Sequence, residues 1–109
     1  MLDSEQEAAE IDGVDPWKAA MQGDLDALLQ YIDNNGDVNQ RDRENNTPLH
    51  WACQENHLDM VGVLVSRNAD LDPVNDFQST PLHYACREGN LDIVTGLINF
   101  NANIEARNK

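Results

Sequence analysis

Residues 47–53 read Thr47-Pro48-Leu49-His50-Trp51-Ala52-Cys53, and residues 80–86 read Thr80-Pro81-Leu82-His83-Tyr84-Ala85-Cys86. The second run begins 33 residues after the first. When residues 42–74 are aligned with residues 75–107 without a gap, 13 of the 33 positions are identical. A fixed period of this length is typical of proteins that are built from stacked structural repeats.

Each run has the residues expected at the start of a short helix. Threonine can cap a helix through its hydroxyl, and proline is favoured in the first turn, where its missing N–H would have no partner. Leu49, Ala52 and Cys53 follow at i, i+3 and i+4, so one face of the helix is apolar and small. Apolar residues at helical spacing predict a second helix in residues 58–65, and again in residues 91–98. One such pair cannot bury its apolar face alone, so neighbouring pairs must stack.

Polar residues and glycine mark the ends of these helices. Residues 56–57 and 89–90 are expected to end the first helix of each pair before the second one begins. Asn68 and Asn101 are expected to end the second helices in the left-handed conformation that asparagine tolerates at a C-terminal cap. Each unit is then two helices followed by an extended finger.

Residue types, order and period together resemble the ankyrin repeat, whose period is 33 residues and whose signature is Thr-Pro-Leu-His-x-Ala. The resemblance covers residues 13–109 and implies an all-α solenoid of stacked helix–turn–helix units with β-hairpin fingers, in about three repeats. We predict a degenerate N-terminal capping repeat at 13–41, a second repeat at 42–74 and a third at 75–107. Residues 108–109 would begin a fourth finger. We therefore expect a domain truncated at its C-terminus and able to self-associate through its uncapped third repeat.

The fingers should span residues 38–46 and 71–79. Ankyrin repeats usually place glycine in the finger turn, but this chain has Asn45 and Gln78 there. Asparagine accepts a positive φ with little strain. Glutamine does so less readily, so the second finger is expected to depart from the usual geometry.

The N-terminal part is acidic and its repeat is degenerate. Residues 1–12 are predicted to be a flexible tail, because residues 1–15 hold six acidic side chains and no basic one. The tail is either an unstructured lead-in or a docking segment for a basic partner. Trp17 is expected to pack over the open end of the core rather than to bind a ligand.

Composition excludes several functions. The chain carries 20 Asp and Glu residues against 7 Lys and Arg, a formal net charge of −13. This charge argues against binding nucleic acid or anionic lipid, which attract basic surfaces. We find neither a transmembrane run nor a secretory signal.

Cys53 and Cys86 occupy the same position in successive repeats. They are expected to be buried thiols without a disulfide, which favours a cytoplasmic location.

The sequence contains none of the common catalytic, phosphate-binding or metal-binding motifs. The chain lacks a phosphate loop, Cys-x-x-Cys, His-Glu-x-x-His and a serine elbow. We therefore predict no catalytic residue, no metal, no cofactor and no enzyme activity. His50 and His83 could be a metal or acid–base pair, but the ankyrin resemblance implies that each ring ties the finger to the following helix. His57 is expected to face solvent.

Function is then expected to lie in a surface that binds a protein or an extended peptide, on the concave side made by the first helices and the fingers. Trp51, Tyr84 and Phe77 would form a short aromatic stripe flanked by arginines. Trp, Tyr and Arg are the residue types that dominate binding hot spots. Trp51 and Tyr84 could equally fill space between helices, whereas a contact role is favoured for Phe77. The other predicted contacts are Arg43, Glu44, Asn46, Gln54, Glu55, Arg87 and Glu88.

A narrower resemblance rests on two runs that contain Leu-His-Trp-Ala and Leu-His-Tyr-Ala. Residues 44–52 and 78–85 look like the ankyrin part of Asp-His-His-Cys (DHHC) palmitoyltransferases. In that family the ankyrin part recruits substrates on the cytosolic side, while a separate transmembrane part transfers the acyl group. The resemblance implies the same recruiting role here as an alternative to a general binding scaffold. Tyr84 in place of a second tryptophan departs from that pattern.

Overall fold

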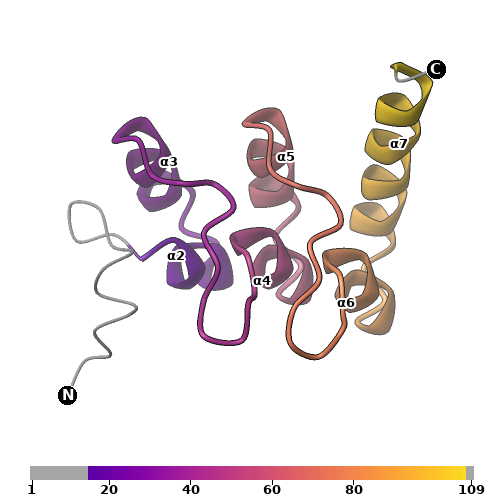
Figure 1. The fold of residues 1–109 in the computed structure, drawn as a ribbon, viewed down its shortest axis with the longest axis horizontal. Coiled ribbons are helices and arrows are strands. Elements are labelled where there is room, and N and C mark those ends of the chain that lie inside the picture. Colours follow the sequence, from indigo (N-terminus) through magenta and orange to yellow (C-terminus); the bar gives the residue numbers. More distant parts are fainter. Residues whose placement is uncertain (1–14, 108–109) are drawn as a thin grey trace.

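The computed structural model describes residues 15–107, with side chains described for residues 15–100. Its helices are α2 (Pro16–Gln22), α3 (Leu25–Asp33), α4 (Pro48–Gln54), α5 (Leu58–Ser66), α6 (Pro81–Arg87) and α7 (Leu91–Arg107). They form three helix pairs that lie side by side (Figure 1). The inner helices α2, α4 and α6 make one row, and the outer helices α3, α5 and α7 make the other. The predicted repeat fold is confirmed, and none of these helices is long and apolar enough to cross a bilayer.

The predicted helix starts are confirmed in the second and third repeats. Thr47 has an extended backbone, and its side chain accepts from the His50 N–H that opens α4. In return His50 Nδ1 accepts from the Thr47 N–H at 2.9 Å. Thr80 and His83 repeat this reciprocal capping box at α6, with 2.8 Å for the second bond. Histidine therefore takes the place that Glu or Gln usually holds in this motif.

The first repeat starts its helix with different residues and keeps the same geometry. Asp15 caps α2 by accepting from the N–H groups of Trp17 and Lys18 at 3.0 Å. Trp17 is buried, and its Nε1 donates to the Gln40 carbonyl at 2.8 Å. The tail prediction for residues 1–12 lies outside the described residues.

Asparagine ends the outer helices in two of the three repeats. Asn35 and Asn68 adopt φ values of 70° and 68°, which confirms the prediction for Asn68. The prediction for Asn101 is wrong, because α7 continues through it to Arg107. Pro73 follows Asn68 closely and disfavours a helix before it. Residues 102–106 contain neither proline nor glycine, so the chain can continue as a helix.

Each finger is closed by an asparagine or aspartate turn. Asp42 Oδ1 accepts from the N–H groups of residues 44 and 46, and Asn75 Oδ1 accepts from those of residues 77 and 79. These turns hold Asn45 at φ 63° and Gln78 at φ 57°. The expected departure at Gln78 is therefore wrong, since the side chain at position 75 enforces the turn. No β-strand is assigned among residues 15–107, so the described fingers are hairpin-shaped loops.

Small side chains allow the inner helices to pack closely. Ala19, Ala52 and Ala85 stand one repeat apart and are all buried in the same core. The neighbouring position differs only in the third repeat: Ala20 and Cys53 are buried, but Cys86 is exposed. The expectation that both thiols are buried is wrong for Cys86. The α6 helix packs against α4, and no described element covers the far side of α6.

A turn residue of each later repeat bonds to the preceding inner helix. His57 Nε2 lies 2.9 Å from the Met21 carbonyl, and Asn90 Nδ2 donates to the Cys53 carbonyl at 2.9 Å. His57 is half-buried rather than solvent-facing, so that expectation is wrong. Gly23 has a φ of 73° and faces His57, where a Cβ would lie 2.7 Å from the ring. The imidazole thus joins the first repeat to the second.

Candidate functional site

The predicted contact residues lie on two kinds of element. Arg43, Glu44 and Asn46 belong to the finger at residues 38–46, and Phe77 belongs to the finger at residues 71–79. The remaining residues lie on α4 and α6 or cap their C-terminal ends: Trp51, Gln54, Glu55, Tyr84, Arg87 and Glu88. The finger tips and the inner helices face the same side of the molecule, away from the outer helices (Figure 1).

His50 connects the second repeat to the finger of the third. Its side chain is 1% exposed, and its Nε2 lies 2.9 Å from the Ser79 carbonyl. Because Nδ1 accepts from Thr47, Nε2 carries the proton and donates to Ser79. Burial lowers the pKa of His50, so the ring is neutral at pH 7. This arrangement is structural, and the described residues contain no group of three or more side chains that could hold a metal.

Trp51 and Tyr84 use their polar atoms inside the protein. Trp51 is half-buried, and its Nε1 donates to Asp42 Oδ2 at 3.0 Å. Tyr84 is 9% exposed, and its hydroxyl accepts from Asn75 Nδ2 at 2.9 Å. Its ring also meets His50 edge-on, with ring centroids 5.9 Å apart. Both aromatics therefore support the fold, and Trp51 keeps an accessible edge.

Asn75 is a central residue that the sequence interpretation missed. Its side chain is 4% exposed and donates to Asn46 Oδ1 at 2.7 Å as well as to Tyr84. Asn46 is itself buried, so its amide serves this network. A signal was present in the sequence. The acceptor Asp42 and the donor Trp51 occupy the same repeat positions as Asn75 and Tyr84. In the later repeat the finger residue donates and the aromatic residue accepts.

Phe77 is the most exposed aromatic side chain among the described residues. It is 66% exposed, and the nearby Val74 is 52% exposed. Backbone bonds hold the finger in place, because Asp76 N–H donates to the Glu44 carbonyl at 2.9 Å. Asn45 Nδ2 also donates to Asp76 Oδ1 at 2.7 Å. The apolar tip is thus presented to solvent by an ordered loop.

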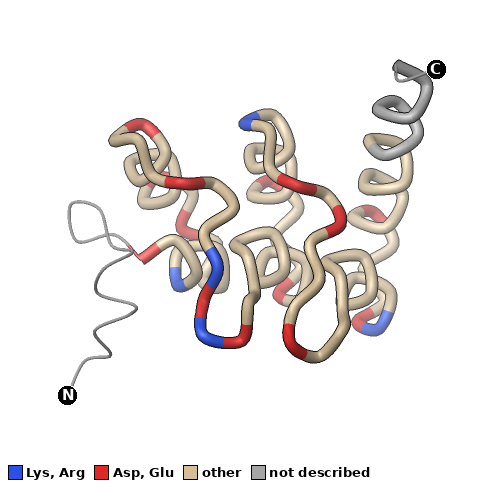
Figure 2. Tube along the Cα trace, in the orientation of Figure 1, with Lys and Arg blue, Asp and Glu red and all other residues tan. Residues whose placement is uncertain are grey.

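A shallow groove lies beside this finger. It has a volume of about 220 Å³ and is lined by Gln78, Ser79, His83, Tyr84 and Arg87. The Arg87 guanidinium lies 4.8 Å from the Tyr84 ring centroid, a cation–π distance. No acidic side chain lines the groove. It therefore offers hydrogen-bond donors on an aromatic base, whereas acidic residues predominate on the described chain as a whole (Figure 2).

Several known proteins share part of this sequence. Acyl-CoA-binding domain-containing protein 1 of Arabidopsis thaliana is 44% identical over 45 residues, which are 41% of this chain and 13% of that protein. Osteoclast-stimulating factor 1 of Gallus gallus is 45% identical over 47 residues, which are 43% of this chain and 23% of that protein. The chain thus spans less than a quarter of the length of these curated relatives.

A family profile described as ankyrin repeats, in three copies, matches residues 17–108. The match covers most of the chain and agrees with the three helix pairs, the capping boxes and the 33-residue period. Ankyrin repeats indicate a module for protein–protein interaction, and such domains are generally not catalytic. The chain belongs to the ankyrin repeat family.

Proposed function

We propose that the chain binds an extended segment of a partner protein across its fingers and inner helices, without catalysing a reaction. The observation that carries this proposal is Phe77, a large apolar side chain that is 66% exposed on an ordered finger. Burying such a ring in a partner would contribute about 1.5–3 kcal/mol. The exposed ring is not part of the core of the free domain.

Polar residues around Phe77 complete the proposed surface. Arg87 lies stacked on Tyr84 and faces the groove beside the finger, so its guanidinium is held in place for a carbonyl or carboxylate. Arg43 and Glu44 would contact the partner from the first finger. Gln54, Glu55 and Glu88 would contribute polar contacts from the ends of α4 and α6. Trp51 would offer its accessible edge, and the buried Asn46 and Tyr84 would support the surface from below.

A substitution series tests this surface once a partner is captured. Phe77→Ala should weaken partner binding at least tenfold and leave the thermal midpoint unchanged, because the ring is exposed. Leu91→Ala is the matched control, since Leu91 is 74% exposed on the outer helix α7. Equal affinity of the two variants for the partner, with both folded, would place the site elsewhere. Trp51→Ala is less informative, because it also breaks the bond to Asp42.

Self-association through the third repeat is a second proposed contact. His83 and Cys86 are exposed, whereas their counterparts His50 and Cys53 are buried by the next repeat. A second copy could cover this open face. Sedimentation of the wild-type chain and of Cys86→Arg would test it, because a buried charge would disrupt the contact. A monomer at high concentration for both proteins would refute it.

The palmitoyltransferase alternative has weaker support. It rests on the aromatic residues after His50 and His83, and both rings have structural partners that explain their presence. Reading the transcript beyond codon 109 for membrane spans and a Cys-rich Asp-His-His-Cys segment decides between this alternative and a general scaffold. We also propose a cytoplasmic location, because an exposed free thiol at Cys86 suits a reducing compartment.

A further inference from the structure

The outer helices carry an apolar groove that the concave surface does not use. The groove has a volume of about 460 Å³ and lies over α5 and α7, with a contribution from α3. Its apolar lining includes Leu25, Leu58, Val61, Ile93 and Phe100. The row of outer helices lies opposite the finger tips (Figure 1), so a ligand here would not compete with one at Phe77.

Two glycines let a ligand approach the helix backbones in this groove. A Cβ added at Gly62 would meet no atom within 4 Å, and one added at Gly96 would meet only Phe100 at 3.9 Å. Both glycines line the groove. Glycine inside a helix costs about 0.8–1.0 kcal/mol relative to alanine. Packing within the described domain therefore does not explain why residue 62 is a glycine, because a Cβ would fit there.

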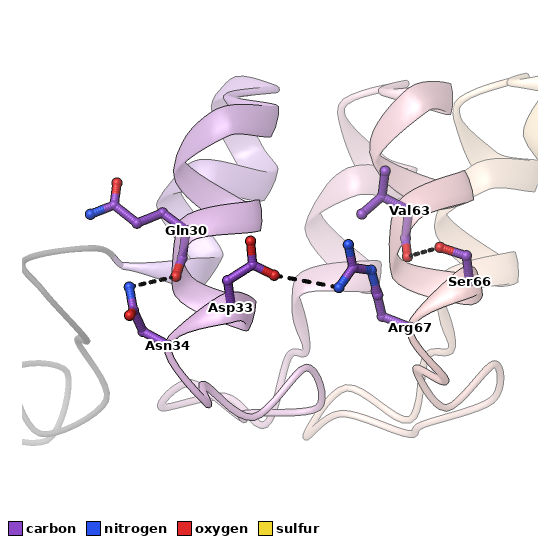
Figure 3. Close-up of polar contacts among 6 residues, drawn as sticks. All are labelled: Gln30, Asp33, Asn34, Val63, Ser66 and Arg67. Carbon is purple, nitrogen blue, oxygen red and sulfur yellow. Dashed lines mark hydrogen bonds and ion pairs between the residues drawn. The ribbon is translucent and has the colours of Figure 1, made fainter.

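Acidic side chains recur beside the groove. Asp26, Asp59 and Asp92 lie in the first turns of the three outer helices, one repeat apart, and all are exposed. Asp59 is the charged side chain in the lining of the groove. The Arg67 guanidinium, at the end of α5, lies 3.5 Å from the Asp33 carboxylate (Figure 3). The described outer face is therefore apolar in the groove and acidic beside it, except at Arg67, which is paired with Asp33.

We propose that this groove docks an amphipathic helix of a partner protein, with an apolar stripe flanked by lysine or arginine. Side chains at i, i+3, i+4 and i+7 of the partner would enter the apolar groove. Its backbone would approach α5 most closely at Gly62. Its basic flanks would face Asp59 and Asp92, and the net charge of −13 would speed the encounter. The α5 helix is nine residues long, about 14 Å, and so matches two to three turns of a partner helix.

Two synthetic peptides of equal composition test the occupant. One 14-residue Leu/Lys peptide places all leucines on one helical face, and the other distributes them around the helix. In ¹⁵N-resolved NMR, the first peptide should give saturable shifts of the Gly62 and Gly96 amides that weaken with added salt. The second should give none at these amides. Equal shifts from both peptides would show charge attraction alone and would overturn the proposal, as would shifts confined to the finger at Phe77.

A filled groove provides the matched variant. Gly62→Leu puts a side chain into open space and replaces a poor helix former, so the fold should be retained. It should weaken binding of the first peptide at least tenfold. Thr95→Leu is the control, because Thr95 is the equivalent position one repeat later, is exposed and does not line the groove. Unchanged affinity in folded Gly62→Leu would refute the site. If phosphatidylcholine vesicles and not the peptide shift the Gly62 amide, the groove binds lipid and the proposed occupant is wrong.

Discussion

Asn75 donates from Nδ2 to the Tyr84 hydroxyl at 2.9 Å, and this bond replaces the one from Trp51 Nε1 to Asp42 Oδ2 in the preceding repeat. In both repeats the finger residue also accepts from two backbone N–H groups of its own turn. The same side chain therefore shapes the finger and ties it to the inner helix. The finger residue and its aromatic partner thus form one hydrogen-bonded pair in each of the two repeats.

Asn75→Asp separates these two roles. The carboxylate can still accept from the N–H groups of Phe77 and Ser79, but it can no longer donate to Tyr84 or Asn46. We expect a loss of about 1–3 kcal/mol in the free energy of unfolding, because the buried Asn46 Oδ1 loses its donor. Urea denaturation measures it. The double variant Asn75→Asp, Tyr84→Trp restores the residue pair of the preceding repeat, so it should lose less than the sum of the two single variants. Additive losses would show that the pair is not coupled.

Gln78→Gly should stabilise the domain. Gln78 is held at φ 57°, and a left-handed conformation costs a residue with a Cβ about 1–2 kcal/mol. Part of this gain is lost to the greater unfolded-state entropy of glycine, so the expected net gain is about 0.5–1 kcal/mol. Gln78→Ala is the control, because it removes the side chain but keeps the Cβ. A gain of equal size for both variants would show that the polar side chain, rather than the backbone, is responsible.

The features that followed a local rule could be predicted from the sequence. Threonine caps, proline in the first turn and asparagine at the end of a helix act on neighbouring residues, so Thr47, Pro48 and Asn68 took their expected places. The features that depend on another repeat could not. Cys86 has the local sequence of Cys53, and only the packing of the next inner helix distinguishes them. His57 is half-buried because it bonds to the first repeat, which its own turn does not reveal.

The candidate site shows the same division. The sequence identified Phe77 as an unusual finger residue, because no core position explains an aromatic ring there. It could not distinguish contact from support for Trp51 and Tyr84, since both roles require a ring at that position. Their hydrogen bonds to the fingers show a supporting role for both rings, and a contact role stays a proposal. The groove at Gly62 was missed, because a glycine in an apolar helix gives no sign of what lies outside it.

The two cysteines should differ in reactivity. Burial raises the pKa of the Cys53 thiol to about 12, so almost no thiolate forms at pH 8. Cys86 is exposed and should react readily with an aromatic disulfide reagent. We expect one rapid equivalent per native chain, and two after denaturation in urea. The Cys86→Ser variant should show no rapid phase. Two rapid equivalents in the native wild-type chain would indicate that α4 and α6 separate on the timescale of the reaction.

His50 should make the stability of the domain depend on pH near neutrality. Its pKa is lowered on folding, chiefly by burial, so below about pH 6.5 the unfolded chain binds a proton that the folded chain does not. Protonation also puts an N–H on Nδ1, which faces the Thr47 N–H at 2.9 Å. The contribution of neutral His50 to the free energy of unfolding is therefore fully present above its unfolded pKa. This contribution is lost as the pH falls, by at most about 1.4 kcal/mol per pH unit.

Denaturation at pH 7.5 and 5.5 measures this loss, since most carboxylates stay charged in that range. His50→Gln is the informative variant, because glutamine is a usual residue at this position of a capping box and does not titrate. It should be less stable than the wild type at pH 7.5, since it is a poorer match to the Ser79 carbonyl. It should also lose less stability between the two pH values. His83→Gln makes the same substitution at the exposed capping box of α6 and serves as the matched control. If His50→Gln and the wild type lose the same amount, the pH dependence arises from another group.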